Sequence, residues 1–175
     1  MKKIILVLTL SFITFNTFLH AEDFYNLDYN LTTSENNQLN ATLTDKGWDF
    51  QGVYNKALFI VIFGHECPPC LAEIPSFVQA IKNHEDKLSI VAIEAQGLTS
   101  TELQEFKQNH AINYPLLSRN HRENEYLFND VASKLNWEGQ LPFLVTINKY
   151  GEINGSQLGR VSHEQIESLI DTLNQ

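Results

Sequence analysis

The sequence predicts an α/β domain with a central mixed β-sheet and helices on both faces. The continuous apolar run at residues 58–63 is typical of a strand buried on both faces of a parallel sheet, and residues 88–93 are expected to form a second buried strand. A segment with helical spacing follows each run, and the chain closes with two short strands and a helix. The order of these elements, βαβα, a further helix and then ββα, predicts the class.

The first half of the predicted domain alternates strands with helices. The strand at 58–63 leads into a segment whose apolar residues recur at helical spacing: Leu71, Ile74, Phe77, Val78 and Ile81. Pro75 lies within this segment and is expected to kink the helix, because proline removes a backbone hydrogen bond. After the strand at 88–93, residues 99–102 fit a capping box that opens a second helix. Residues 116–117 are expected to form a short strand.

The second half is predicted to supply one more helix and the closing ββα unit. After a polar stretch, residues 118–125, the apolar residues of a helical segment are Leu127, Val131 and Leu135. Leu141-Pro142 then leads into a strand at 143–148, which a turn at residues 150–151 joins to a returning strand at 153–158. A second capping box, residues 162–165, precedes the closing amphipathic helix.

The N-terminus is typical of a secretory signal. Lys2 and Lys3 precede an apolar run from residue 4 to residue 15, and Leu19-His20-Ala21 supplies a small residue before the expected cut. The run is short for a membrane span, and an uncleaved anchor is the alternative. No cysteine lies near the cut, so a bacterial lipid anchor is not expected. The predicted location is therefore the periplasm, where disulfides form.

Three segments follow from these patterns. Residues 1–21 are the predicted signal peptide, residues 22–57 an N-terminal extended or hairpin extension of the domain, and residues 58–175 the main domain. Within the extension, the polar and Asn-rich stretch 32–40 is expected to be a loop between extended segments.

The mature chain is predicted to be strongly acidic. Without residues 1–21, which hold two of the 12 Lys and Arg, 10 basic side chains remain against 21 acidic ones, a formal charge of −11. Such a charge opposes binding to nucleic acid or to an anionic membrane surface, and favours solubility or basic client proteins.

Cys67 and Cys70, the only two cysteines, are separated by Pro68 and Pro69 where the first strand runs into its helix. A bridge closing so short a loop contributes only about 1.9 kcal/mol on the chain-entropy formula, against roughly 3 for a fifteen-residue loop. A C-x-x-C pair beside a βαβ pattern is instead typical of thiol–disulfide exchange, in which one sulfur attacks and the other resolves. Zinc needs four ligands, and no second C-x-x-C or H-x3–5-H is present, so no metal site or cofactor is expected.

These motifs together resemble the TlpA/ResA-like branch of the thioredoxin superfamily, which are exported thiol:disulfide oxidoreductases. The similarity lies in "FIVIFGHECPPCLAEIPSF", "LSIVAIEA", "INYPLL" and "LPFLVTINKYGEI", and extends from about residue 58 to the end. Two features depart from the family pattern. Glu66 stands where the family usually has Trp, and the stretch 118–140 looks several residues longer than usual.

The resemblance implies a thioredoxin-like fold and a role for each site residue. It implies that Cys67 is the exposed attacking sulfur at the helix tip and that Cys70 resolves. Glu73 matches a partly buried acid that exchanges protons with the resolving thiol, although the residues alone leave it an ordinary solvated helix residue. Pro142, by itself compatible with a simple strand-start proline, matches a cis-proline that packs on the disulfide and leaves a backbone edge for an extended client.

The client surface is expected to include Leu141, which would line a groove, and the residues around the cysteines: Glu66, Pro68 and Pro69. His65 is expected to be a surface residue that flanks the site. Trp48 and Trp137 are expected to fill core or groove positions.

The charges around the cysteines favour a reductant over an oxidant. Neither proline has an N–H, which leaves only the amides of Cys70 and Leu71 to stabilise a Cys67 thiolate at the helix tip. Glu66 and Glu73 add negative charge, which opposes the thiolate further. Strong oxidants are strong because their reduced form is stabilised, so a poorly stabilised thiolate indicates a reductant.

The expected partners are client proteins with disulfides or thiols and an upstream membrane-bound electron donor. The family likeness suggests clients such as the haem-attachment cysteines of apocytochrome c or copper-site cysteines. The same two cysteines are compatible with a disulfide oxidase or isomerase. They are also compatible with a Cu(I) metallochaperone, because soft sulfur ligands select that ion. A non-catalytic interaction module on the same fold is a further alternative.

Overall fold

A computed structural model describes residues 26–53 and 55–175. The predicted signal peptide, residues 1–21, lies outside them. In chain order the elements are β1 (Leu27–Thr32), β2 (Gln38–Leu43), β3 (Trp48–Phe50), β4 (Ala57–Phe63), α1 (Pro68–Asn83), β5 (Leu88–Glu94), α2 (Ser100–Asn109), β6 (Leu116–Ser118), α3 (Arg122–Lys134), β7 (Phe143–Ile147), β8 (Ile153–Leu158) and α4 (His163–Leu173). None of the helices in these two ranges is long and apolar enough to cross a membrane.

The central sheet is mixed, as predicted. Its five strands lie in the order β6-β5-β4-β7-β8. The β4–β5 and β5–β6 pairs are parallel, whereas β4–β7 and β7–β8 are antiparallel. The apolar runs recognised in the sequence form β4 and β5, and every residue of β4 is buried. The carboxyl ends of these two strands therefore meet at one edge of the sheet, where α1 begins.

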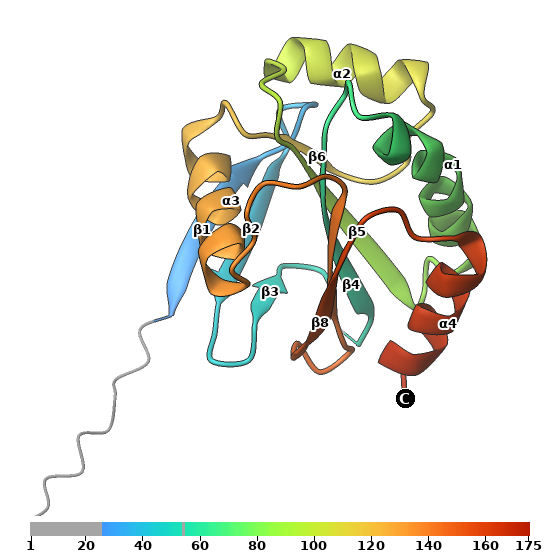
Figure 1. Cartoon of the computed structure of the whole chain (residues 1–175). Helices are drawn as coiled ribbons and strands as arrows, with labels where there is room; N and C mark the ends of the chain where they lie inside the picture. The colour runs from blue at the N-terminus through green and yellow to red at the C-terminus, as the bar shows by residue number, and fades with distance from the viewer. Residues whose placement is uncertain (1–25, 54) are drawn as a thin grey trace, which may run out of the picture.

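Helices cover both faces of the sheet (Figure 1), and each face has its own core. Alternate residues of β4, such as Phe59 and Val61, pack on one face with α1, α2 and α4. The residues between them, such as Leu58 and Ile60, pack on the other face with α3 and strands β1–β3. The prediction of helices on both faces is confirmed, and a small sheet shares the second face with α3.

The N-terminal extension is more regular than its sequence indicated. Strands β1, β2 and β3 form a three-stranded antiparallel sheet. The expected loop at 32–40 is shorter, because Thr32 already pairs with Gln38 and the turn closes between Thr33 and Asn37. The amide of Ser34 also donates to the carbonyl of Leu116 at 2.9 Å, which ties this turn to β6.

The helix boundaries follow local chemistry. Both capping boxes form, with Thr99 and Glu102 at the start of α2 and Ser162 and Gln165 at the start of α4. Helix α1 runs through Pro75 to Asn83. Helix α3 begins at Arg122, inside the polar stretch that was expected to precede the helix, because acidic residues in its first turn interact favourably with the helix dipole.

Candidate active site at the tip of helix α1

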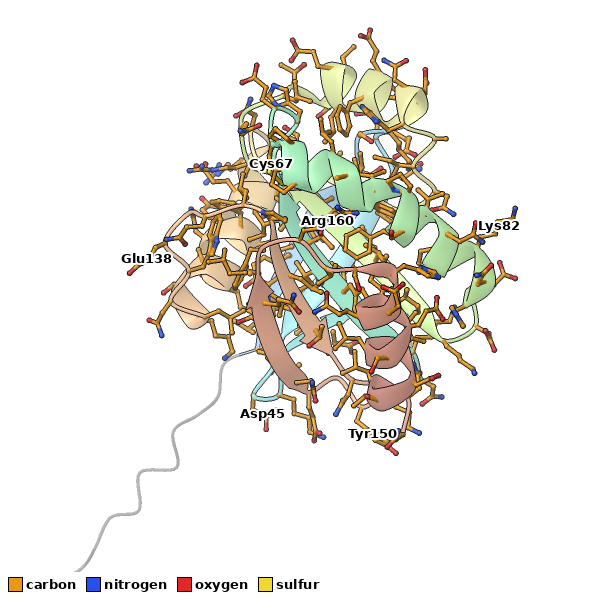
Figure 2. All side chains as sticks on the ribbon, turned by 45° about the vertical axis from the view of Figure 1, so that its right-hand side comes forward. Asp45, Cys67, Lys82, Glu138, Tyr150 and Arg160 are labelled. Atoms are coloured by element: carbon orange, nitrogen blue, oxygen red, sulfur yellow. A yellow bond between two sulfur atoms is a disulfide. The ribbon has the colours of Figure 1, made fainter. Side chains whose placement is uncertain are left out.

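The two cysteines form a disulfide where α1 begins. Cys67 is the N-cap of the helix and Cys70 lies in its first turn, with 5.2 Å between their Cα atoms. Figure 2 shows Cys67 at the start of α1, with Arg160 on the neighbouring loop before α4. Cys67 is 8% exposed and Cys70 1%. Cys67 is thus less exposed than expected, because its amide donates a hydrogen bond to the carbonyl of Gly64 at 3.2 Å and its side chain packs against the core.

The helix tip offers few donors to a Cys67 thiolate. Pro68 and Pro69 occupy the first two helical positions and have no N–H, and both are exposed. The amide of Leu71, expected to face the sulfur, donates to the Cys67 carbonyl at 3.0 Å instead. Of the two amides anticipated from the sequence, that of Cys70 has no such backbone partner within the described part of the chain. The helix end therefore offers a Cys67 thiolate less stabilisation than the two amides expected from the sequence would give.

Glu73 is a buried acid one turn beyond Cys70. It is 2% exposed, and its Oε2 accepts a hydrogen bond from the amide of Val161 at 3.2 Å. Burial raises the pKa of the Glu73 carboxyl to about 7, against the opposing effects of the Val161 hydrogen bond and the charge of Arg160. Glu73 therefore has access to both protonation states at neutral pH.

A small cavity connects this acid with the resolving sulfur. It has a volume of about 10 Å³ and is lined by Cys70, Glu73, Tyr114 and apolar side chains of β4 and α1. A cavity of this size has room for about one water molecule. The arrangement gives a short path for a proton between the Cys70 sulfur and the Glu73 carboxylate.

The peptide bond between Leu141 and Pro142 is cis. It precedes β7, the antiparallel neighbour of β4. The Pro142 carbonyl accepts from the Gly159 amide at 2.9 Å, and no backbone hydrogen bond among residues 26–53 and 55–175 uses the N–H or carbonyl of Leu141. Leu141 therefore presents an unpaired backbone edge.

An open groove lies beside Leu141. It has a volume of about 410 Å³, and its walls come from the loop after β5, from α3 and from the segment that precedes Pro142. Trp137 stacks on Phe143 at 5.6 Å and meets Phe128 edge-on at 5.5 Å, and its indole N–H donates to the Gln140 carbonyl at 2.7 Å. Of the two tryptophans assigned to core or groove, Trp137 thus lines this groove and Trp48 is fully buried in the core.

Glu66 and His65 lie between β4 and Cys67. Glu66 is exposed, and its amide donates to the side-chain oxygen of Gln96 at 2.8 Å. The Nδ1 atom of His65 lies 2.9 Å from Oε1 of Glu94, the last residue of β5, which is fully buried. Sequence reasoning missed Glu94 altogether, although a lone acid at the end of an apolar strand was the available signal.

A larger cavity lies away from the cysteine pair. A cavity of about 460 Å³ lies at the opposite end of the sheet, where β4 begins and β7 ends. Across residues 26–53 and 55–175, no three His, Cys, Asp or Glu side chains converge in a way that would hold a metal ion.

The fold and the Cys67–Cys70 pair define a thioredoxin-like thiol:disulfide oxidoreductase. The chain belongs to the AhpC/TSA family, whose model matches residues 29–156. No curated protein sequence matches it.

Solved structures share the fold at low identity. A thioredoxin-family thiol:disulfide interchange protein from Chlorobium tepidum is 17% identical, with 86% of this chain and 94% of that chain covered and a TM-score of 0.65. StoA from Bacillus subtilis is 15% identical, with 82% and 96% covered and a TM-score of 0.59. A secreted Mycobacterium tuberculosis disulfide oxidoreductase, homologous to DsbE of E. coli, is 15% identical, with 85% and 96% covered and a TM-score of 0.59. The expected thioredoxin-like fold is confirmed.

Proposed function

We propose that this protein is an exported reductant of specific client disulfides, working through a Cys67/Cys70 dithiol–disulfide cycle. One observation carries the proposal. Cys67 and Cys70 form a disulfide at the start of a helix, and the buried Cys70 lines a small cavity together with the titratable acid Glu73. A purely structural bridge has no need of such an acid.

The proposed reaction moves two electrons to the client. The Cys67 thiolate attacks one sulfur of a client disulfide, forms a mixed disulfide and releases the other client sulfur as a thiolate. The Cys70 thiol then loses its proton to Glu73, and the resulting thiolate attacks the Cys67 sulfur. The Cys67–Cys70 disulfide forms again, and the client leaves with both of its sulfurs reduced. A membrane-bound donor is proposed to restore the dithiol.

The direction of transfer follows from the poor stabilisation of the thiolate. Two prolines at the helix start, the Leu71 amide engaged elsewhere and an exposed acid at Glu66 all disfavour the reduced, ionised form. A pair whose reduced form is disfavoured gives up electrons readily. This supports a reductant over an oxidase or isomerase.

The proposed client site is the unpaired backbone edge of Leu141 together with the adjoining groove. An extended client segment would pair with this edge as a short added strand, and its side chains would enter the space beside Trp137. Pro142 is proposed to pack on the disulfide, and Pro68, Pro69 and Glu66 to border the client. The family resemblance suggests haem-attachment or copper-site cysteines as the client thiols.

Export is supported by the charged, apolar and small-residue pattern of residues 1–21. A disulfide oxidoreductase that shares the fold is described as secreted. The periplasm is the proposed compartment.

Trapping the mixed disulfide tests the proposal. With Cys70→Ser, the client cannot be displaced, so non-reducing gels of the native host are expected to show a species that disappears on reduction. Cys67→Ser is the matched control, because it removes the attacking sulfur and leaves Cys70 in place. Absence of any adduct specific to the Cys70→Ser variant would contradict the assignment.

The Cu(I) metallochaperone alternative needs a separate measurement. Copper titration of the reduced mature protein separates the two functions, since a pure reductase is expected to show no tight stoichiometric binding. Tight binding at one ion per pair of cysteines would favour the metallochaperone.

A further inference from the structure

Glu94 and His65 form a hydrogen-bonded pair at the carboxyl end of the sheet, beside the turn that carries Cys67. Glu94 is 0% exposed and accepts four hydrogen bonds, each at 2.9 Å. Oε1 accepts from His65 Nδ1 and the Gln96 amide, and Oε2 accepts from the amides of Gly97 and Leu98. This is full use of a carboxylate's acceptor capacity.

These contacts determine which ring nitrogen of His65 carries the hydrogen that is donated to Glu94. The three backbone partners are N–H donors, and an ionised carboxylate only accepts, so Nδ1 is assigned as the protonated nitrogen from the hydrogen-bond network. Nε2 is then the ring nitrogen that carries the lone pair. A histidine oriented by a buried carboxylate in this way is the usual arrangement beside an activated nucleophile.

The same turn holds Cys67. The amide of Cys67 donates to the carbonyl of Gly64 at 3.2 Å, so residues 64–67 form a hydrogen-bonded turn with His65 as its second residue. The ends of such a turn lie within about 7 Å of each other. His65 and Cys67 therefore lie two residues apart in one short hydrogen-bonded turn.

The loop after β5 contacts this turn at several points. The Gln96 side chain binds the amide of Glu66, and the amide of Ala95 donates to the carbonyl of Phe63 at 2.9 Å. Gln96 also packs so closely on Gly64 that a Cβ added there would lie 2.4 Å from its side-chain atoms. The turn that holds His65 and Cys67 is thus tied to the loop that follows Glu94.

The ionisable groups around His65 are acidic. Glu94 faces it from β5, Glu66 follows it in the turn, and Glu102 at the start of α2 lies close enough for their charges to interact. Its side chain is 25% exposed. A positive charge on the ring is attracted to all three carboxylates.

We propose that His65, oriented by Glu94, accepts the proton of the Cys67 thiol when the dithiol reacts. Glu94 is a positioning residue in this proposal. His65 takes the proton as the Cys67 thiolate forms, the thiolate attacks the client disulfide, and the released client thiolate takes the proton from His65. The two thiols then have separate proton partners, His65 for Cys67 and Glu73 for Cys70. This inference rests on the proposed function, because it assigns a proton path to the same exchange reaction.

The test is the pH dependence of Cys67 alkylation in the Cys70→Ser background, with iodoacetamide as the probe. Adding His65→Gln is expected to move the rate profile to higher pH by about one unit and to slow alkylation about tenfold at pH 7, because the thiolate fraction falls tenfold per unit. Glu94→Gln is expected to shift the profile in the same direction.

The chain offers a matched control. His84 Nε2 lies 2.8 Å from Glu167 Oε2, a similar histidine–carboxylate pair at the opposite end of α1. His84→Gln is expected to leave the alkylation profile unchanged. A His65→Gln profile that superimposes on those of the parent and of His84→Gln would overturn the proposal.

A second readout uses the Cys70→Ser protein and needs no substitution at His65. In Cys70→Ser, the NMR signals of the His65 ring are expected to respond to ionisation of the Cys67 thiol, and blocking that thiol by alkylation is expected to change the His65 titration. An unchanged His65 titration after alkylation would contradict the proposal. Both experiments work without a client, so failure to trap a client in the host would leave their outcome intact.

Discussion

Cys70 and Glu73 line the same small cavity, one helical turn apart on α1. Both side chains are buried, and the Glu73 carboxyl accepts a hydrogen bond from the Val161 amide. Because burial favours the neutral acid, the fold carries an energetic cost at neutral pH that an uncharged residue would not impose. Such a cost is expected at a functional position.

Glu73→Gln is expected to stabilise the oxidised protein at neutral pH. The pKa of this carboxyl rises from 4.5 in the unfolded chain to about 7 in the folded protein. Its penalty is therefore absent below pH 4.5, grows as pH rises, and is complete above pH 7, where it amounts to about 3 kcal/mol. Gln keeps an oxygen for the Val161 amide. In urea unfolding, the free energy of unfolding of the variant minus that of the wild type should increase by this amount between pH 4.5 and 8.

Glu85 provides the control, because its side chain is exposed. Glu85→Gln is expected to follow the wild-type stability curve at every pH. If the difference between Glu73→Gln and wild type stayed constant with pH, the raised pKa would be wrong.

The same variant is expected to slow the resolving step. With a thionitrobenzoate group coupled to Cys67, Cys70 must lose its proton before it displaces the leaving group. Removing a general base typically costs a hundredfold or more. The release rate of Glu73→Gln is therefore expected to fall at least tenfold at pH 8 and to lose its inflection near pH 7, measured by absorbance. A rate and profile equal to the wild type would exclude Glu73 as the proton acceptor.

Asn124 is expected to hold the N-terminal hairpin on the main domain. The side chain is fully buried, its Oδ1 accepts from the Thr32 amide at 3.1 Å, and its Nδ2 donates to the carbonyls of Thr32 and Ser118 at 2.9 and 3.0 Å. Asn124→Ala leaves these buried groups unsatisfied and should cost about 3 kcal/mol in the free energy of unfolding. Asn129→Ala, an exposed position on the same helix, should change it by less than about 0.5 kcal/mol. Equal effects would mean that the hairpin does not depend on this contact.

The parts of the fold that the sequence predicted are those that depend on local patterns. The run from Leu58 to Phe63 is apolar throughout because both of its faces are buried, and the capping boxes at Thr99 and Ser162 are short motifs with one physical outcome. The cysteine pair was identified for the same reason. All of these signals lie within a few neighbouring residues.

The features that were missed depend on contacts between distant segments. Glu94 forms a hydrogen bond with His65, 29 positions away in the sequence, and Asn124 forms one with Thr32, 92 positions away. Strand β3 is only three residues long, which gives too short a pattern to recognise. Local sequence patterns therefore could not predict these side-chain contacts, because the partners are far apart in the sequence.

Trp137 tests the proposed client groove. Trp137→Ala removes the aromatic wall that stacks on Phe143, so we expect reduction of a disulfide-bonded client peptide to slow about tenfold, as for an aromatic residue at the centre of an interface. Reaction with a small disulfide should change less than about twofold. The matched control is Tyr126→Ala, an exposed aromatic on α3. Equal slowing with both substrates would place the defect at the disulfide and contradict a groove for clients.

The most direct test of the central claim is a redox titration of the mature protein, following the Cys67–Cys70 pair by quantitative thiol labelling. We expect one reversible two-electron transition, with a potential near that of thioredoxin, about −270 mV. A potential near that of the strong periplasmic oxidant class, about −120 mV, would contradict the reductant assignment. Absence of any reversible transition would contradict the exchange chemistry itself.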